Sequence, residues 1–442
     1  MSRRRLLIVV TALIVSAAGC GEVVEGDDPI PGDRITDDSF DSFAAGTFLE
    51  TEWAGDHVQL AADRLSGEYL SRIIDAGGDG VRLAALSWLT REPHGKPLPG
   101  DGGRESGYNA GNIDMSDNVL LLRLDERAAM GDGQILADAS GRGNDAIVAS
   151  AGDVLRPETG LFDGALNDSV TTHAFIDLEQ TRDLDFGTGD LTWALWSRST
   201  QDCTGNKVYI GGEDSNADVH LWLGCADSEA LSFCNVRPGE TGGRAAGFFR
   251  ASQDRANNNG TGFCGTSRIN DGQWHHLALV KSGHAPTATL TLYVDGEIEM
   301  TIDDVIFDRE LTLDNRPSFT FGNFNDGTAQ YQAAASFDEI AIWRRALSGD
   351  EIAALHRRGA LRLRFQVRVC SDPSCATPSS FLGPDLDSNA FFIDRVGPQS
   401  GGELGSAVDD LSGRYFQYRA LFDSDIPGAS AFLDAVTLTV QR

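Results

Sequence analysis

The sequence is short of cationic residues and of helical periodicity. Its 442 residues include 36 Lys and Arg against 66 Asp and Glu, which gives a formal net charge of −30 at pH 7. A surface with this charge repels phosphate backbones, so nucleic acid is excluded as a partner. Stretches with the period of an amphipathic helix are scarce and Gly is abundant, with 50 residues. These features predict an all-β chain, and its length favours more than one domain.

Long apolar runs are absent after the first residues, so no segment beyond them is expected to span a bilayer. Arg3–Arg5 and the apolar stretch Leu6–Ala18 have the pattern of a signal peptide, which we assign to residues 1–19. The sequence Ala17-Ala18-Gly19-Cys20 resembles a bacterial lipobox, with Ala17 where Leu is usual. It predicts lipidation of Cys20 and a lipoprotein anchored to the outer membrane or cell surface. The alternative is ordinary signal cleavage followed by secretion.

The sequence also lacks the common catalytic patterns. Its 8 histidines show no metal-ligand spacing. No Ser-His-Asp order stands out, and Gly141-x-Gly143 lacks the strand and helix that a nucleotide-binding loop requires. We therefore expect a protein that is not an enzyme.

Cysteine is sparse but informative. Seven cysteines occur, and an even number remains once Cys20 is set aside. This count predicts disulfides and an extracytoplasmic, oxidising compartment. Cys370 and Cys375 are expected to pair with each other, because Asp372-Pro373 can turn the chain between them. Three pairings remain open for the other four, which are Cys203, Cys225, Cys234 and Cys264.

The strongest strand signal runs from Trp274 to Ile302. Apolar residues occupy both alternating faces of residues 274–281, which favours a central strand covered on both sides. Two further strands follow, and Asp295-Gly296 between them is typical of a type I′ hairpin turn. Ile298, Met300 and Ile302 are expected to point inward. Successive antiparallel strands again indicate an all-β fold.

Composition changes divide the chain into segments. Residues 20–45 are rich in Asp, Gly and Pro and are predicted to form an acidic flexible tether. Residues 99–117 read as a linker. Neither residues 46–98 nor residues 361–442 contain a complete core, so we expect them to form one smaller β-sandwich that is interrupted by the domain of residues 118–360. The alternative is three domains in series.

The middle segment carries a set of motifs in a recognisable order. Asp125-Glu126 follows the strand VLLLRL, and GLFDGAL, LTWALWS, QWHHLALV and LTLYVDG come next. The last motif is FDEIAIWRRALSGDEIAALHRRG. Together they resemble the laminin-G-like jelly-roll domain of the concanavalin A-like lectin/glucanase superfamily. The resemblance implies two curved antiparallel sheets that pack face to face.

Local chemistry predicts one short helix at the end of this domain. Ser348 suits the N-cap position, and Glu351 completes a capping box with it. Arg357 and Arg358 favour the negative helix end, and Gly359 is expected just beyond that end.

The resemblance implies which sites to look for. Superfamily members that hydrolyse β-glucans carry Glu-x-Asp-x-x-Glu on one strand, and this sequence has no such motif. Asp338-Glu339 are adjacent, so a regular strand directs them to opposite faces. Many proteins of this fold hold a structural Ca²⁺, for which we nominate Asp138 and Asn144 with Asp338. The alternative is that Asp138 and Asn144 only stabilise a turn.

A carbohydrate site needs an aromatic platform among polar side chains. Trp193, Trp196, Trp274 and Trp343 are assigned to the core. The candidate ligand-binding residues are therefore Trp222, Asp214, Asn216, Asn257, Asn258 and Tyr331. The expected function is non-catalytic recognition of a glycan or glycoprotein by the jelly-roll domain at the cell surface. The alternatives are a structural or protein-interaction module of the cell envelope and, third, a glycoside hydrolase.

Overall fold

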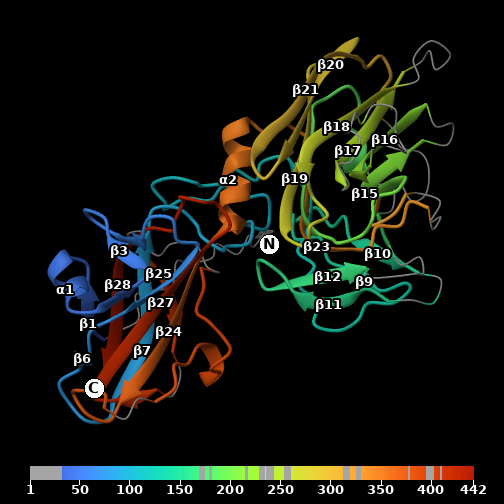
Figure 1. Cartoon of the computed structure of the whole chain (residues 1–442). Coiled ribbons are helices and arrows are strands. Elements are labelled where there is room, and N and C mark those ends of the chain that lie inside the picture. Colours follow the sequence, from blue (N-terminus) through green and yellow to red (C-terminus); the bar gives the residue numbers. More distant parts are fainter. Residues whose placement is uncertain are drawn as a thin grey trace, which may run out of the picture.

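The computed structural model describes residues 32–150, 152, 154–168, 175–178, 182–214, 218–227, 234, 243–252, 260–311, 319–324, 330–376, 379–394, 403–408 and 411–442. The expected signal peptide and Cys20 lie outside these ranges. Two lobes of antiparallel sheets sit side by side, with one longer helix between them (Figure 1). Within the described ranges, none of the helices has the length and apolar character needed to cross a membrane.

The predicted run of three strands is confirmed. It forms β19 (Trp274–Ser282), β20 (Thr287–Val294) and β21 (Glu297–Ile306), which pair antiparallel in that order. Asp295 and Gly296 have φ angles of 51° and 81°, as a type I′ turn requires. Both faces of β19 are buried, because Leu277 faces the main core and Ala278 a second cluster. Ile298 was wrongly assigned inward: its side chain is 60% exposed.

The larger lobe is a jelly roll of two eight-stranded sheets. One has the order β11-β12-β23-β14-β19-β20-β21, with β8 also pairing β23; the other has the order β18-β17-β16-β15-β22-β13-β10-β9. The first sheet thus joins strands from the start and the end of the domain. The remaining bounds are β8 (Asn118–Leu122), β9 (Ile135–Leu136), β10 (Ala146–Ala149), β11 (Arg156–Thr159), β12 (Gly164–Asp168), β13 (Phe175–Leu178), β14 (Leu191–Arg198), β15 (Asn206–Glu213), β16 (Val219–Ala226), β17 (Arg244–Ala251), β18 (Thr261–Arg268), β22 (Phe319–Phe321) and β23 (Ala335–Trp343).

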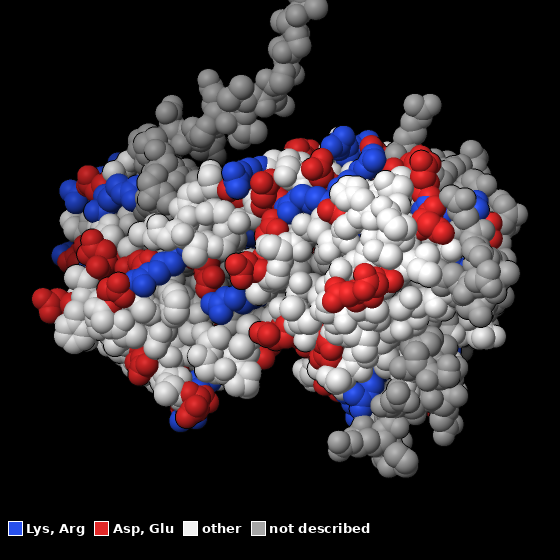
Figure 2. All heavy atoms as spheres, turned by 90° about the horizontal axis from the view of Figure 1, so that it is seen from above, with Lys and Arg blue, Asp and Glu red and all other residues white. Residues whose placement is uncertain are grey.

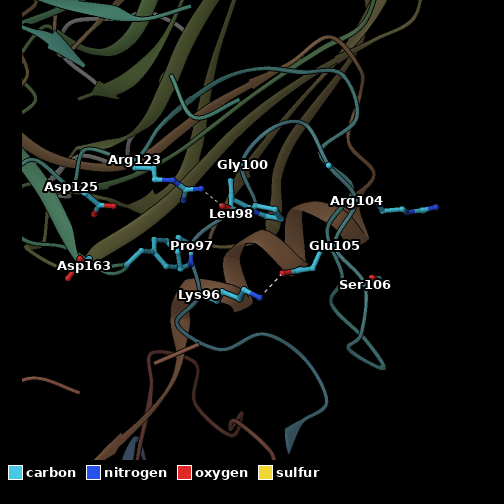
Figure 3. A pocket seen from close by; sticks show the side chains of 13 residues that line it. Lys96, Pro97, Leu98, Gly100, Arg104, Glu105, Ser106, Arg123, Asp125 and Asp163 are labelled. Atoms are coloured by element: carbon cyan, nitrogen blue, oxygen red, sulfur yellow. Dashed lines mark hydrogen bonds and ion pairs between the residues drawn. The ribbon is translucent and has the colours of Figure 1, made fainter. Parts of the chain in front are cut away.

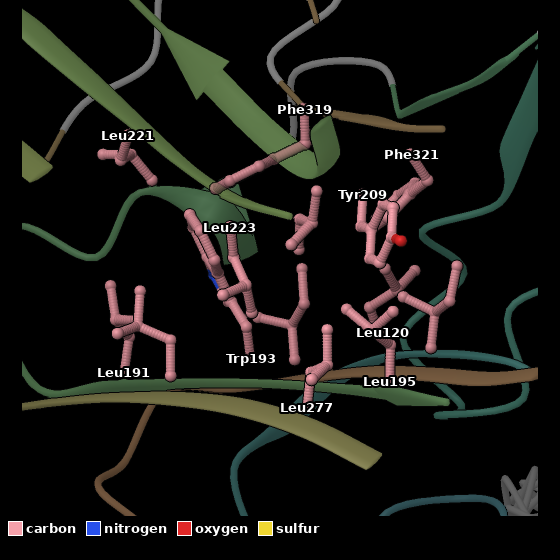
Figure 4. Packing of buried hydrophobic residues seen from close by; sticks show 14 of the residues in the cluster. Leu120, Leu191, Trp193, Leu195, Tyr209, Leu221, Leu223, Leu277, Phe319 and Phe321 are labelled. Atoms are coloured by element: carbon pink, nitrogen blue, oxygen red, sulfur yellow. The ribbon is translucent and has the colours of Figure 1, made fainter. Parts of the chain in front are cut away.

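The main core fills the space between these two sheets. Trp193 on β14 is fully buried and meets Phe319 of the opposite sheet edge to face, with ring centroids 5.4 Å apart. Leucines from both sheets, such as Leu195 and Leu223, pack around this pair (Figure 4). Interdigitation of large side chains from two inner faces is the usual way in which a β-sandwich is stabilised.

The smaller lobe combines strands from both ends of the chain. β7 pairs β28 in one sheet and β5 pairs β27 in the other, and Trp88 stacks on Phe365 between the sheets with centroids 4.5 Å apart. The bounds are β1 (Asp33–Asp37), β2 (Thr47–Leu49), β3 (Thr51–Trp53), β4 (Val58–Leu60), β5 (Ser66–Leu70), β6 (Ile74–Asp75), β7 (Val81–Thr90), β24 (Leu361–Cys370), β25 (Glu403–Ala407), β26 (Ser412–Gly413), β27 (Tyr415–Ser424) and β28 (Leu433–Gln441).

Part of the expected tether is folded. Residues 33–37 form β1, which pairs β28, and residues 40–44 form the short helix α1 (Phe40–Ala44). Phe43 is fully buried in the core of the smaller lobe. These residues fold because β28 supplies a partner strand for β1. With that partner, a few apolar residues among acidic ones are enough to join the sheet and the core.

Helix α2 (Gly349–Ala360) has the predicted capping box between Ser348 and Glu351. Gly359 was wrongly placed beyond its end: it lies inside the helix, where Leu361 is the C-cap. A Cβ atom on Gly359 would lie 2.5 Å from a ring carbon of Trp196, so glycine here allows the helix to approach the sheet closely. Two short 3-10 helices complete the structure, at Arg182–Leu184 and Pro384–Leu386.

Three disulfides form. The predicted Cys370–Cys375 bond is confirmed, and the other four cysteines pair as Cys203–Cys225 and Cys234–Cys264. Disulfides persist in oxidising surroundings, so they indicate an extracellular protein.

The main core offers a direct test. We expect Trp193→Ala to lower the free energy of unfolding by about 3–5 kcal/mol, because it removes a fully buried aromatic ring and leaves a cavity. Urea unfolding followed by circular dichroism measures this change. Ile306→Ala, at a position 45% exposed, is the control and should change stability by less than about 0.5 kcal/mol. Equal effects of the two substitutions would contradict the assigned packing.

Candidate functional site: a cleft between the lobes

A cleft of about 940 Å³ lies where the two lobes meet. The jelly roll contributes its wall from β14, from the start of β19 and from the turn at Asp295-Gly296, while the smaller lobe contributes β24 and residues 424–427. Helix α2 adds Ala353, His356 and Arg357. This volume is within the usual range for small-molecule sites, which often form between domains.

Trp274 contributes a large aromatic ring to the lining of this cleft. It is the first residue of β19 and remains partly exposed, whereas Trp196, which lines the same cleft, is only 4% exposed. The guanidinium of Arg198 lies over the Trp274 ring, 4.9 Å from its centroid. Ile426 of the smaller lobe packs in the same apolar cluster. Trp274 was expected in the core; it packs against the buried cluster of Trp196 but is only partly buried and also lines the cleft.

The arginines of the cleft are matched by carboxylates. Each ion pair has its nitrogen and oxygen at hydrogen-bonding distance, so these pairs present fixed donors and acceptors to the cleft, and Asp271, Asp295 and Glu297 add further carboxylates to its wall. More widely, acidic and basic side chains are interspersed on the face of the molecule in Figure 2. The pairs are Arg198 with Glu158 (2.7 Å), Arg357 with Glu92 (2.6 Å), Arg362 with Asp425 (2.5 Å) and Arg364 with Asp423 (2.6 Å).

His275 is held between two carboxylates at the cleft wall. Its Nδ1 lies 2.8 Å from Asp295 Oδ2 and its Nε2 lies 3.1 Å from Asp271 Oδ1. Burial lowers the pKa of His275, but the two carboxylates more than offset this, so the net shift is upward. The imidazolium in turn holds the pKa of Asp295 below its usual value despite burial. The neighbouring His356 has its pKa lowered by burial.

Asp338 positions the loop that forms one edge of the cleft. Its side chain is fully buried, and its Oδ2 accepts hydrogen bonds from the backbone N–H groups of Leu161 (2.8 Å) and Phe162 (3.3 Å). Burial, followed by the nearby charge of Glu339, raises the pKa of Asp338 well above its usual value. Leu161 lines the cleft and Phe162 lines a second pocket, so this loop separates the two.

The strand alternation assumed for Asp338-Glu339 does not hold. Pairing between β14 and β23 shifts register here, and Glu339 has a φ of 48°, so the pair lies in a β-bulge. Glu339 accepts from the backbone N–H of Leu98 at 3.0 Å and pairs with Arg123 at 3.0 Å. Burial raises the pKa of Glu339 to about 7. Both carboxylates thus hold segments of backbone near the junction of the lobes.

The second pocket has a volume of about 530 Å³ and lies between the linker and the jelly roll. Figure 3 shows Arg123 directed toward Leu98 and Lys96 directed toward Glu105. Asp125 and Asp163 lie on the side of the pocket away from Glu105. Its walls therefore consist largely of groups that are already paired with one another.

The expected calcium ligands are only partly brought together. Asp138 accepts hydrogen bonds from the backbone of Leu121, Ser140 and Asn144, as in the turn-stabilising alternative. Asp338 instead binds the loop at residues 161–162. The part of the chain that the structure describes contains no group of three or more His, Cys, Asp or Glu side chains arranged for a metal ion.

Three of the six expected sugar-contacting residues make contacts within the protein. Trp222 is 4% exposed and packs in a small cluster with Phe324, so it offers no free face to a ligand. Asp214 is 2% exposed and forms an ion pair with Arg309 at 3.0 Å. Tyr331 packs edge to face on Phe324, with centroids 5.8 Å apart. Asn216, Asn257 and Asn258 lie outside the described residues.

Residues 170–353 match a family model described as the concanavalin A-like lectin/glucanases superfamily. The larger lobe has a concanavalin A-like fold. None of the curated proteins matches the chain.

Solved structures that are similar to part of this chain have low sequence identity to it. The binding domain of Paraclostridial Mosquitocidal Protein 1 is 15% identical with a TM-score of 0.40, over 54% of this chain and 52% of that one. The botulinum neurotoxin type G receptor-binding domain is 13% identical with a TM-score of 0.37, over 55% and 51%. Trypanosoma rangeli sialidase in complex with 2,3-difluorosialic acid is 16% identical with a TM-score of 0.37, over 54% and 32%. The chain spans about half of the first of these structures.

The raised pKa of His275 predicts a pH-dependent contribution to stability. A raised folded-state pKa stabilises the protein below the unfolded value of about 6.5, and this contribution is lost as pH rises through the folded value. We therefore expect His275→Gln to lower the melting temperature more in acid than in alkaline buffer. His284→Gln, at an exposed position on the β19–β20 loop, is the control and should leave the melting temperature close to that of the wild type. A pH-independent effect of His275→Gln would contradict the assigned imidazolium.

Proposed function

We propose that the protein is a non-catalytic carbohydrate-binding protein that holds a neutral glycan in the cleft between its lobes. The observation that supports this most directly is the partly exposed Trp274 ring, set among fixed hydrogen-bonding pairs in a cleft of about 940 Å³. A sugar ring has an apolar C–H face that packs on an aromatic ring and hydroxyls that both donate and accept. This combination matches an aromatic anchor with a few fixed polar groups.

The pairing of charges favours a neutral ligand. Arg362 and Arg364 are each bound to a carboxylate of β27 or of the segment that follows it, at 2.5 Å and 2.6 Å. An anionic ligand would have to displace one of these carboxylates, and a cationic one would have to displace an arginine. Sugar hydroxyls can instead bind to the free lone pairs and N–H groups of pairs that stay intact.

A ligand in the cleft would meet residues of both lobes. Trp274 and His275 belong to the jelly roll, whereas Arg362 and Ile426 belong to the smaller lobe. A glycan in this position would contact both, so the smaller lobe contributes to recognition instead of serving only as a scaffold. Lipid attachment at Cys20, a bacterial surface location and a structural calcium ion remain predictions from the sequence.

The alternative is a structural or protein-interaction module of the cell envelope. In that case a segment of another protein would occupy the cleft, and no free glycan would bind there. A screen of neutral and acidic polysaccharides by calorimetry separates the two functions. Binding of no polysaccharide would overturn the glycan proposal in favour of the interaction module.

Trp274 provides the sharpest test of the proposal. We expect Trp274→Ala to weaken binding of the best neutral polysaccharide at least tenfold, which corresponds to about 1.4 kcal/mol. The matched control is Phe40→Ala, which removes an aromatic ring that is 56% exposed on α1 of the smaller lobe. Its affinity should equal that of the wild type. Wild-type affinity of Trp274→Ala, with an unchanged melting curve, would contradict the assigned site.

A further inference from the structure

A second cluster, which the proposed glycan site does not use, is buried at the junction of the lobes. Its side chains are those of Lys96, Glu105, Tyr108, Arg358 and Asp394, and the first is directed toward Glu105 in Figure 3. Lys96 and Asp394 are each 4% exposed, Tyr108 is 6% and Arg358 is 2%. Lysine and aspartate are almost never buried to this extent unless they are paired, and here Lys96 is paired with both Glu105 and Asp394.

The amine and one carboxyl of this cluster are neighbours. Lys96 Nζ lies 3.4 Å from Asp394 Oδ1, a buried oxygen that accepts no hydrogen bond. Lys96 Nζ donates to the Tyr108 hydroxyl at 2.9 Å, and that hydroxyl donates to Asp394 Oδ2. A continuous hydrogen-bonded chain therefore leads from the ammonium to the carboxylate.

The charges of the cluster allow this amine and acid to become neutral. Glu105 is already matched by Arg358, whose guanidinium donates to both carboxylate oxygens at 2.8 Å. Lys96 and Asp394 remain as the second pair. Burial raises the pKa of Asp394 to about 6. Transfer of one proton through Tyr108 would produce a free amine and a protonated acid side by side.

We propose that Lys96 and Asp394 condense to form an intramolecular isopeptide bond, with Tyr108 as the proton relay. The Nζ lone pair attacks Asp394 Cγ, and a C–N bond forms. Two protons leave Nζ, the first through the Tyr108 hydroxyl and the second through Tyr108 or Glu105, which lies 3.1 Å from Nζ. Both protons reach one carboxyl oxygen, its bond to Cγ breaks, and water leaves. No oxidant, reductant or cofactor is needed.

Backbone contacts fix both reacting residues. Phe392 exchanges two backbone hydrogen bonds of 2.9 Å with Phe365 on β24, which holds the segment that ends at Asp394. The N–H of Gly95 donates to the carbonyl of Arg358 at 2.8 Å, which holds the segment that begins at Lys96. Holding two reactants at such distances removes a large part of the activation barrier to their condensation. The product would tie the segment between β7 and β8 covalently to the segment that follows β24.

Mass spectrometry of the full chain tests the bond directly. After reduction of the disulfides and digestion with trypsin, we expect a branched peptide that joins residues 92–104 to residues 369–395 and is lighter than the two by one water. Detection of these two peptides only in linear form would overturn the proposal. This measurement uses the wild-type protein and depends on no variant being folded.

Variants identify the relay. Tyr108→Phe keeps the ring but removes the hydroxyl, and we expect it to yield mostly linear peptides while retaining a cooperative melting curve. Lys96→Met removes the amine and should abolish the branched peptide, whereas Lys207→Met on β15 should leave it intact. Branched peptide in Tyr108→Phe at the wild-type yield would refute the relay, and its presence in Lys96→Met would refute Lys96 as the nucleophile.

Discussion

The buried guanidinium of Arg358 is the interaction on which the arrangement of the lobes depends. It lies on the last turn of α2, binds both oxygens of Glu105 and donates to the backbone carbonyls of Lys96 and Pro97. Removing one partner of a buried ion pair leaves an uncompensated charge, so such a contact strongly resists separation. It joins α2, at the end of the jelly roll, to the linker of residues 99–117, which contains Glu105. The cleft beside α2 owes its shape to this junction.

The cleft is chemically distinct from the cores on either side of it. Its walls contain arginines that are paired with carboxylates, around the partly exposed ring of Trp274. A short way behind the wall, burial raises the pKa values of Asp338 and Glu339. The molecule thus uses buried carboxylates to hold backbone segments in place and partly exposed ones to present hydrogen-bonding groups.

Short sequence motifs correctly predicted the structural features that depend only on neighbouring residues. The Asp295-Gly296 turn and the capping box of Ser348 depend only on residues within a few positions, and both formed as expected. The sequence predicted an accessible Trp222 and a buried Trp274, but exposure depends on neighbours far away in the chain. Trp222 packs with Phe324 in a buried cluster, whereas Trp274 is only partly buried and packs in the same cluster as Ile426. The bulge at Glu339 was also hidden, since strand alternation presumes a regular ladder. No pattern within one segment could reveal a cleft assembled from two lobes.

The pairing of β1 with β28 has a consequence for how the chain is made. The first described strand and the last one are partners, and β28 also lies beside β7 in the centre of its sheet. During synthesis the jelly roll has all of its strands available before β28 exists, and domains generally fold as units as they emerge. The first part of the smaller lobe must wait for β28, with its apolar strand edges exposed. An acidic composition around those strands would keep them soluble until β28 has been made.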